Sequence, residues 1–479
     1  MAGDSFNLCS TRVATPTGVV PATIEVRGGR IASVRTAGPA TGLSAAPDAA
    51  AGTAPTFDVG NLAVLPGIID AHVHINEPGR TEWEGFLTAG RAAAAGGVTT
   101  MVVMPLNCSP VATTAAALLG EAYAAAETCA IDHGFWGGVV PGNAGHIQPL
   151  WDAGVLGFKC FLVDSGLDEF RHVSASDLDV AMPLLTHLPP RGAVLLVHAE
   201  DPAEIAHART PSGLDASPRS YAAYLASRPA SAETAAIQLM IDLCRKHGTR
   251  VHIVHVAAAA ALPALARARR EGLPVTAETC PHYLAFAAED IADGQTTFKC
   301  APPIRTRADR EGLWAALADG TLDLIASDHS PCPPELKRLD TGDFAQSWGG
   351  ISSLQLTLPV AWTHAHARGF GLAHIARWLA LAPARLAGID SFKGQIAPGY
   401  DADLTIFDPE ALWTVRAADL EHRHKATPYD GAALRGRVKA TFVRGQQVFR
   451  CSGFERLAPL DRHGSAMEAT GRWVKRTRM

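Results

Sequence analysis

The strongest constraint on this fold is a serial alternation of short apolar runs with longer Ala-rich stretches, from about residue 64 to residue 390. The apolar runs are mostly continuous, which is typical of strands buried on both faces of a parallel sheet. The runs that we expect to form strands are residues 64–74, 98–105, 131–140, 155–163, 193–199, 250–256, 274–280 and 322–328. Helices are expected between them, over residues 83–95, 113–128, 233–247, 258–271 and 307–318.

Eight strand–helix units in series predict an α/β fold, a closed (β/α)8 TIM barrel over residues 64–390. The alternative is an open doubly wound sheet, which typically has a Gly-rich phosphate-binding loop after its first strand. The sequence has no such loop there. Residues 1–63 and 391–455 carry short strand patterns and are each too small for a strong core, so we expect them to pair into one β-sandwich domain. Residues 456–479, with a basic cluster at 475–478, are expected to form a solvated tail.

Composition argues against several classes of protein. Lys and Arg number 42 against 47 Asp and Glu, a net charge of −5 without a basic stripe, which disfavours a nucleic-acid partner. No uncharged apolar run reaches the ~18 residues that span a membrane, and the first 30 residues lack the apolar core of a secretory signal. The nine cysteines are scattered without a C-x-x-C pair, which favours a reducing cytoplasm over disulfides or a cysteine zinc site.

Unusual polar residues fall at the ends of five expected strands, the face where barrel enzymes keep their active sites. His72 and His74 end the first run and share one face, because strand side chains alternate. The other residues of this set are Lys159, His198, His255 and Asp328. One such histidine alone is more often a hydrogen-bonded core or surface residue, and one such aspartate a helix cap. Their convergence on one rim favours a site. His252 lies three positions before His255, on the opposite face, and is interpreted as structural.

Lys159 is the most informative of these residues. It stands between Phe158 and Cys160 in an apolar strand, where an unpaired ammonium is costly to bury and tends to lose its proton. The neutral amine can react with carbon dioxide to give a carbamate that bridges two metals; a salt-bridged lysine is the alternative. We favour carboxylated Lys159 with two divalent cations, zinc or else iron, cobalt or manganese. The expected ligands are His72, His74, Lys159, His198, His255 and Asp328.

Several ordered motifs resemble the cyclic amidohydrolases of the amidohydrolase superfamily. They are LPGIID (65–70) before HVH (72–74), EPGR (77–80), WEG (83–85), GFKCF (157–161), CPHY (280–283), SDHSPCPPE (327–335) and WGGI (348–351). Departures from sister families narrow the choice. Asn76 replaces the Arg with which dihydroorotases hold a carboxylate, and Asp164 replaces a Tyr of hydantoinases and dihydropyrimidinases. Ala301 stands where those enzymes have a Ser.

The resemblance implies that a hydroxide bridging the two metals opens the hydantoin ring of allantoin to give allantoate. It implies that Asp328 is both a ligand and the general base that passes a proton to the leaving nitrogen. Asn107 and Ser330 are candidate substrate contacts, although Asn107 is equally well explained as a turn residue. A homotetramer is implied as well. The alternatives are a dihydropyrimidinase or hydantoinase, and a non-catalytic scaffold protein of the same fold.

Overall fold

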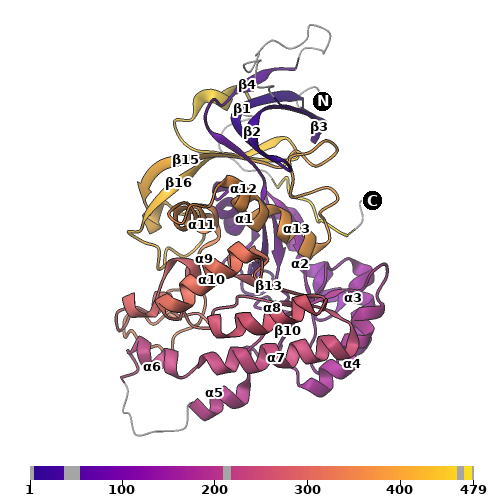
Figure 1. Cartoon of the computed structure of the whole chain (residues 1–479), viewed down its shortest axis with the longest axis vertical. Coiled ribbons are helices and arrows are strands. Elements are labelled where there is room, and N and C mark those ends of the chain that lie inside the picture. The colour runs from indigo at the N-terminus through magenta and orange to yellow at the C-terminus, as the bar shows by residue number, and fades with distance from the viewer. Residues whose placement is uncertain (1–4, 37–53, 209–216, 461–468, 477–479) are drawn as a thin grey trace.

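A computed structural model describes residues 5–36, 54–208, 217–460 and 469–476 of the chain. A small β-domain lies above a larger part whose strands are surrounded by helices (Figure 1). In the described part of the chain, no helix is long and apolar enough to cross a membrane. All nine cysteines are free thiols, and eight of them are buried.

The larger part is the predicted (β/α)8 barrel. Its strands are β6 (Ile68–Val73), β7 (Val98–Val103), β8 (Asp132–Phe135), β9 (Gly137–Gly138), β10 (Phe158–Phe161), β11 (Val194–His198), β12 (Arg250–Ile253), β13 (Val275–Thr279) and β14 (Leu324–Ile325), all paired in parallel. β8 and β9 together occupy one strand position of the barrel and are interrupted at Trp136. On one side, the Trp136 N–H donates to the backbone of Val103 in β7; on the other, the Gly137 N–H donates to the backbone of Gly157, just before β10. A parallel bridge between Val73 and His329 closes the ring.

Helices surround this barrel. They are α1 (Phe86–Ala95), α2 (Ala115–Thr128), α3 (Ile147–Ala153), α4 (Ala175–His187), α5 (Pro202–Ala208), α6 (Tyr221–Ala226), α7 (Ala230–His247), α8 (Leu262–Arg270), α9 (Pro281–Ala285), α10 (Arg307–Asp319), α11 (Thr357–His366), α12 (Leu372–Ala376) and α13 (Ala382–Ala387). Local sequence sets their limits. α10 begins at a capping box of Thr306 and Asp309 and ends at Gly320, whose φ of 84° an L residue rarely adopts.

Both ends of the chain build the small domain, as predicted. Its strands are β1 (Phe6–Thr15), β2 (Gly18–Arg27), β3 (Arg30–Thr36), β4 (Thr56–Asp58), β5 (Ala63–Pro66), β15 (Leu404–Thr414), β16 (Ala433–Val443) and β17 (Gln446–Arg450). The sheet order is β17-β16-β15-β5-β1-β2-β3, and β4 pairs with β1. Its apolar core joins residues from both ends, among them Phe6 and Phe442. Lys393 lies buried between the sheet and the barrel, with Nζ 2.8 Å from an Asp132 oxygen and 2.5 Å from one of Asp403.

The expected single strand over residues 64–74 is two strands. β5 belongs to the small sheet and pairs with β15, whereas β6 is the first barrel strand. The chain passes between them at Gly67, where a Cβ would lie 2.2 Å from Thr99 Oγ1. A close approach of the barrel wall therefore requires glycine at this position, and continuous hydrophobicity cannot reveal the change of sheet.

The expectation of a solvated C-terminal tail is wrong for residues 469–476. Trp473 forms a parallel bridge with His133 of β8. The Arg476 guanidinium lies 3.3 Å from the centroid of the Trp151 ring, and its nitrogens donate to backbone carbonyls of Trp151 and Val155. Basic side chains can pack over aromatic rings, so a basic composition does not by itself indicate a solvated segment.

Candidate metal centre and active site

One half of the candidate site is formed by the end of β6 and the segment after β14. His72 lies in β6 and His74 directly follows it, and both rings face Asp328. The Asp328 Oδ1 atom lies 3.3 Å from His72 Nε2 and 3.4 Å from His74 Nε2. One ligand atom from each of the three residues falls within 4.8 Å of the others. The predicted pairing of the two histidines on one face is present in the structure.

The remaining predicted residues close the other half of this site. The ring centroids of His198 and His255 are 4.6 Å apart, and His255 is 5.5 Å from His72. Phe161 stacks on His198 at 4.6 Å, and the Lys159 Nζ atom lies 4.9 Å from the Phe161 ring centroid. The structure therefore gathers all six side chains at the carboxyl ends of the barrel strands.

Burial sets the protonation states of the site. Lys159 is fully buried, and its Nζ atom makes no hydrogen bond or salt bridge to any described residue. The described residues therefore do not form the salt-bridged lysine that was the alternative to a carbamate. Burial lowers the pKa of Lys159 to about 8. Burial also lowers the pKa of His74 to about 4 and takes the pKa of His255 well below its ordinary value. The imidazoles of His74 and His255 are therefore neutral at pH 7, which is the form in which histidine binds metal ions.

Glu278 is a functional candidate that the sequence reasoning missed. It lies on β13, and its two carboxylate oxygens are 2.6 Å from His72 Nδ1 and 3.0 Å from His252 Nε2. Burial alone would raise the pKa of Glu278, but the two imidazoles lower it to about 2. His252 is thus a structural residue, as interpreted, and its Nδ1 lies 2.8 Å from Thr276 Oγ1. An acidic residue inside one of the expected barrel strands was the available signal.

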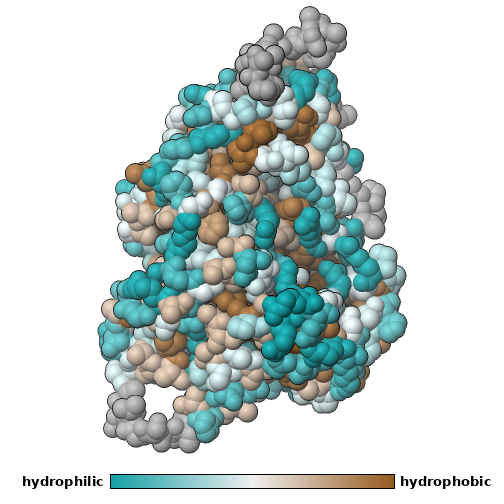
Figure 2. All heavy atoms as spheres, in the orientation of Figure 1, coloured by the Kyte–Doolittle hydropathy of each residue, from teal (hydrophilic) through white to brown (hydrophobic). Residues whose placement is uncertain are grey.

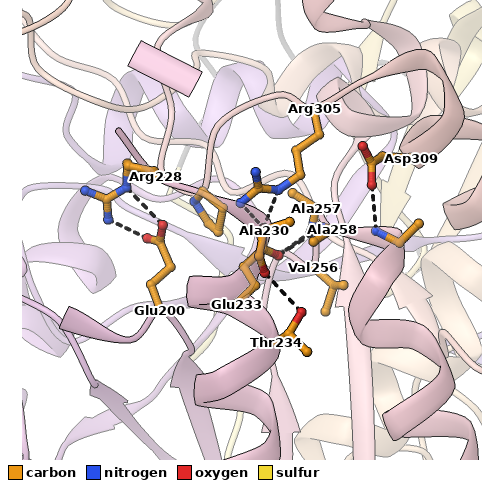
Figure 3. A network of polar contacts seen from close by, with 12 residues as sticks. Glu200, Arg228, Ala230, Glu233, Thr234, Val256, Ala257, Ala258, Arg305 and Asp309 are labelled. Carbon is orange, nitrogen blue, oxygen red and sulfur yellow. Dashed lines mark hydrogen bonds and ion pairs between the residues drawn. The ribbon is translucent and has the colours of Figure 1, made fainter. Parts of the chain in front are cut away.

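Two further buried carboxylates hold the segments that carry His198 and His255 (Figure 3). Glu200 Oε2 is 2.7 Å from His198 Nε2, and the carboxylate pairs with Arg228. Glu233 of α7 accepts the backbone N–H groups of Ala257 and Ala258, at 2.9 and 3.0 Å, just after His255. Arg305 Nε donates to the same carboxylate at 2.7 Å. These ion pairs fix the orientation of the histidines from behind.

The two candidate substrate contacts lie at the rim of the same cluster. Asn107 Nδ2 is 3.2 Å from His74 Nδ1, and Asn107 has a φ of 71°. Ser330 is nearly buried, two residues after Asp328. His255 and Asp328 also have positive φ, 41° and 46°. Left-handed backbone at non-glycine residues costs energy, and such strain tends to gather at functional sites.

Comparison with known proteins agrees with this geometry. The Amidohydrolase family matches residues 63–448. An allantoinase of Streptomyces avermitilis is 46% identical over 92% of this chain and 94% of its own length. An allantoinase of Saccharomyces cerevisiae is 44% identical over 82% of this chain and 84% of its own length. The solved structure of an L-hydantoinase (dihydropyrimidinase) from Arthrobacter aurescens has a TM-score of 0.87 and 29% identity, covering 98% of this chain and 100% of that one.

The chain therefore belongs to the amidohydrolase family, and its site brings His72, His74 and Asp328 close enough together to hold a metal ion. The relatives named above that match it at more than 40% identity over most of its length are allantoinases.

Proposed function

We propose that this protein catalyses the allantoinase reaction, the hydrolysis of the hydantoin ring amide of allantoin to allantoate. The convergence of His72, His74 and Asp328 within 4.8 Å, beside a buried and unpaired Lys159, carries the proposal. Relatives of 46% and 44% identity that are named allantoinases support this choice of substrate. The departures at Asn76 and Asp164 from the dihydroorotase and hydantoinase patterns point the same way.

We propose further that the six side chains hold two divalent metal ions, zinc first among the candidates. The donor set fits such ions, because imidazole and carboxylate suit zinc, iron, cobalt and manganese. Within the described part of the chain, the Lys159 Nζ atom has no hydrogen-bond partner, and N6-carboxylation would make it a two-oxygen ligand able to hold both metals. When bound, the metals supply Lewis acidity, which polarises the ring carbonyl and lowers the pKa of a water.

The proton transfers are assigned to Asp328. Burial alone would raise its pKa, but the neighbouring histidines His72 and His74 keep the pKa lowered, so Asp328 is a carboxylate at neutral pH. A carboxylate can accept a proton from the attacking water and then pass it to the leaving ring nitrogen, which makes the amine a better leaving group. Asn107 and Ser330 are proposed to position the ureido or ring groups of the substrate from the rim of the site.

Substrate turnover tests this assignment. Purified metal-loaded protein is expected to give a kcat/KM for allantoin at least about tenfold above those for hydantoin and dihydrouracil. Faster opening of dihydrouracil would make the protein a dihydropyrimidinase, the second candidate, which the likeness to the Arthrobacter aurescens enzyme favours. A protein that holds no transition metal and gains no activity when metal is added would instead be a non-catalytic scaffold.

We propose a homotetrameric assembly and a cytoplasmic location as well. The assembly rests on the family resemblance, and light scattering of purified protein at several concentrations tests it. The location is supported by nine free thiols, eight of them buried, because a reducing compartment preserves such thiols. Fluorescence microscopy of the tagged chain in its host tests the location.

A further inference from the structure

A cavity opens at the opposite end of the barrel from the candidate metal centre. It has a volume of about 860 Å³, within the range of small-molecule sites. Arg250, Thr276 and Leu324 line it at or next to the first residues of β12, β13 and β14. His255 and Asp328 lie beyond the other ends of β12 and β14, so the cavity is separate from the proposed active site.

Arginine dominates the lining of this cavity. The charged residues around it are Arg250, Arg269, Arg270, Arg377, Arg385, Asp319 and Asp323. Five arginines against two aspartates leave a net of three positive charges in a chain whose net charge is −5. Figure 2 shows a broad hydrophilic patch over the part of the barrel where Figure 1 labels α7 and α8, and Arg269 and Arg270 end α8.

Most of these guanidinium groups lack an acidic partner. Arg269 pairs with Asp323 at 2.6 Å, and Asp319 accepts the backbone N–H of Thr321 at 2.8 Å. Within the described residues, the other four arginines of the lining form no ion pair within 4.0 Å. The lining of the cavity therefore carries a net positive charge that a bound anion would offset.

Arg250 is the central group of this arrangement. It is half-buried at the start of β12, without a hydrogen-bonding partner for its guanidinium in the described part of the chain. Burial and the neighbouring Arg191 lower the pKa of Arg250, and Asp390 opposes them only in part. A guanidinium presents a planar fork of donors that matches carboxylate and phosphate groups, and here the fork has no protein acceptor.

We propose that this cavity is a binding site for a small organic polyanion that carries at least two carboxylate or phosphate groups. Arg250 binds one group in the interior, and the exposed Arg377 and Arg385 bind another at the mouth. Ala266, Ala382 and Leu386 supply apolar wall between the charges, which suits a ligand with a short carbon skeleton. Among the residues that the structure describes, no aromatic side chain lines the cavity, so these residues offer a nucleotide base no stacking partner.

Calorimetric titration of the metal-loaded protein at low ionic strength tests the site. The probes are fructose 1,6-bisphosphate and succinate, with fructose and succinamide as their uncharged counterparts. We expect saturable binding of at least one charged probe, none of the uncharged compounds, and a Kd that rises with salt. Binding of the bisphosphate alone or of succinate alone identifies phosphate or carboxylate as the preferred group, and either result supports the site.

Variants separate this cavity from the metal centre. The double variant Arg377→Ala/Arg385→Ala removes two exposed side chains and should weaken binding at least about tenfold, while metal content and allantoin turnover stay unchanged. Arg30→Ala, an exposed arginine of the small domain, is the matched control and should bind as the wild type does. No saturable binding up to about 10 mM of either charged probe, or equal affinity in the double variant and the wild type, overturns the proposal.

Discussion

Replacement of Lys159 by Met should make the metal-free protein more stable at neutral pH. The Lys159 amine is fully buried and has no hydrogen-bond partner among the described residues, and burial lowers its pKa from 10.5 to about 8. The unfolded chain therefore binds more protons than the folded chain between pH 8 and pH 10.5. Methionine has a similar length and no charge, so Lys159→Met removes this penalty and leaves the packing nearly intact.

The size of the penalty follows from the two pKa values. Their difference corresponds to about 3 kcal/mol, fully present below pH 8 and lost as the pH rises toward 10.5. At pH 10 the same linkage leaves less than about 1 kcal/mol of this penalty. We expect the free energy of unfolding of Lys159→Met to be higher than that of the wild type by up to about 3 kcal/mol at pH 7. At pH 10 the difference should be less than about 1 kcal/mol.

Guanidinium unfolding of chelator-treated protein in carbon dioxide-free buffer measures this difference. Lys246→Met is the control, because Lys246 is exposed and lies 2.8 Å from Asp179. Zinc and bicarbonate together should reverse the order, since only the wild type can form the bridging carbamate. A Lys159→Met advantage that is the same at pH 7 and pH 10 would refute the burial argument. A wild type that gains nothing from zinc and bicarbonate would refute the bridging role.

Three further predictions concern other parts of the molecule. Asp328→Asn should lower kcat for allantoin by at least about 10²-fold with an unchanged circular dichroism spectrum, and near-normal turnover would remove it as the base. Glu278→Gln should weaken zinc affinity about 10- to 100-fold in a competition titration, because His72 loses its 2.6 Å carboxylate partner. Trp473→Ala should reduce the free energy of unfolding by about 2 kcal/mol, since the ring packs against Phe135 at 5.7 Å; an unchanged value would mean the C-terminal segment contributes nothing.

The sequence was sufficient for the parts of the fold and site that depend on local pattern. Continuous apolar runs predicted the barrel strands, and the two-residue period of a strand placed His72 and His74 on one face. The role of Glu278 was not predicted from the sequence, because it depends on contacts between residues that are far apart along the chain. Its partner His72 is 206 positions away in sequence, and only the closed ring brings β13 near β6, with β14 between them. The packing of the C-terminal segment was not predicted for the same reason, since His133, the bridge partner of Trp473, lies in a strand far upstream.

The fold sets protonation states as well as positions in the candidate metal centre. Burial lowers the pKa of His198, as it does for His74 and His255, so the imidazoles are neutral and able to donate lone pairs. Burial should push carboxylates in the opposite direction, yet the pKa of Glu200 is about 2 because Arg228 and His198 outweigh desolvation. A uniformly apolar pocket would neutralise acids and bases alike. An imidazole or guanidinium beside Asp328, Glu278 and Glu200 lowers the pKa of each carboxyl, so charged acids stand beside these neutral imidazoles, which is the combination that binding of divalent metal ions requires.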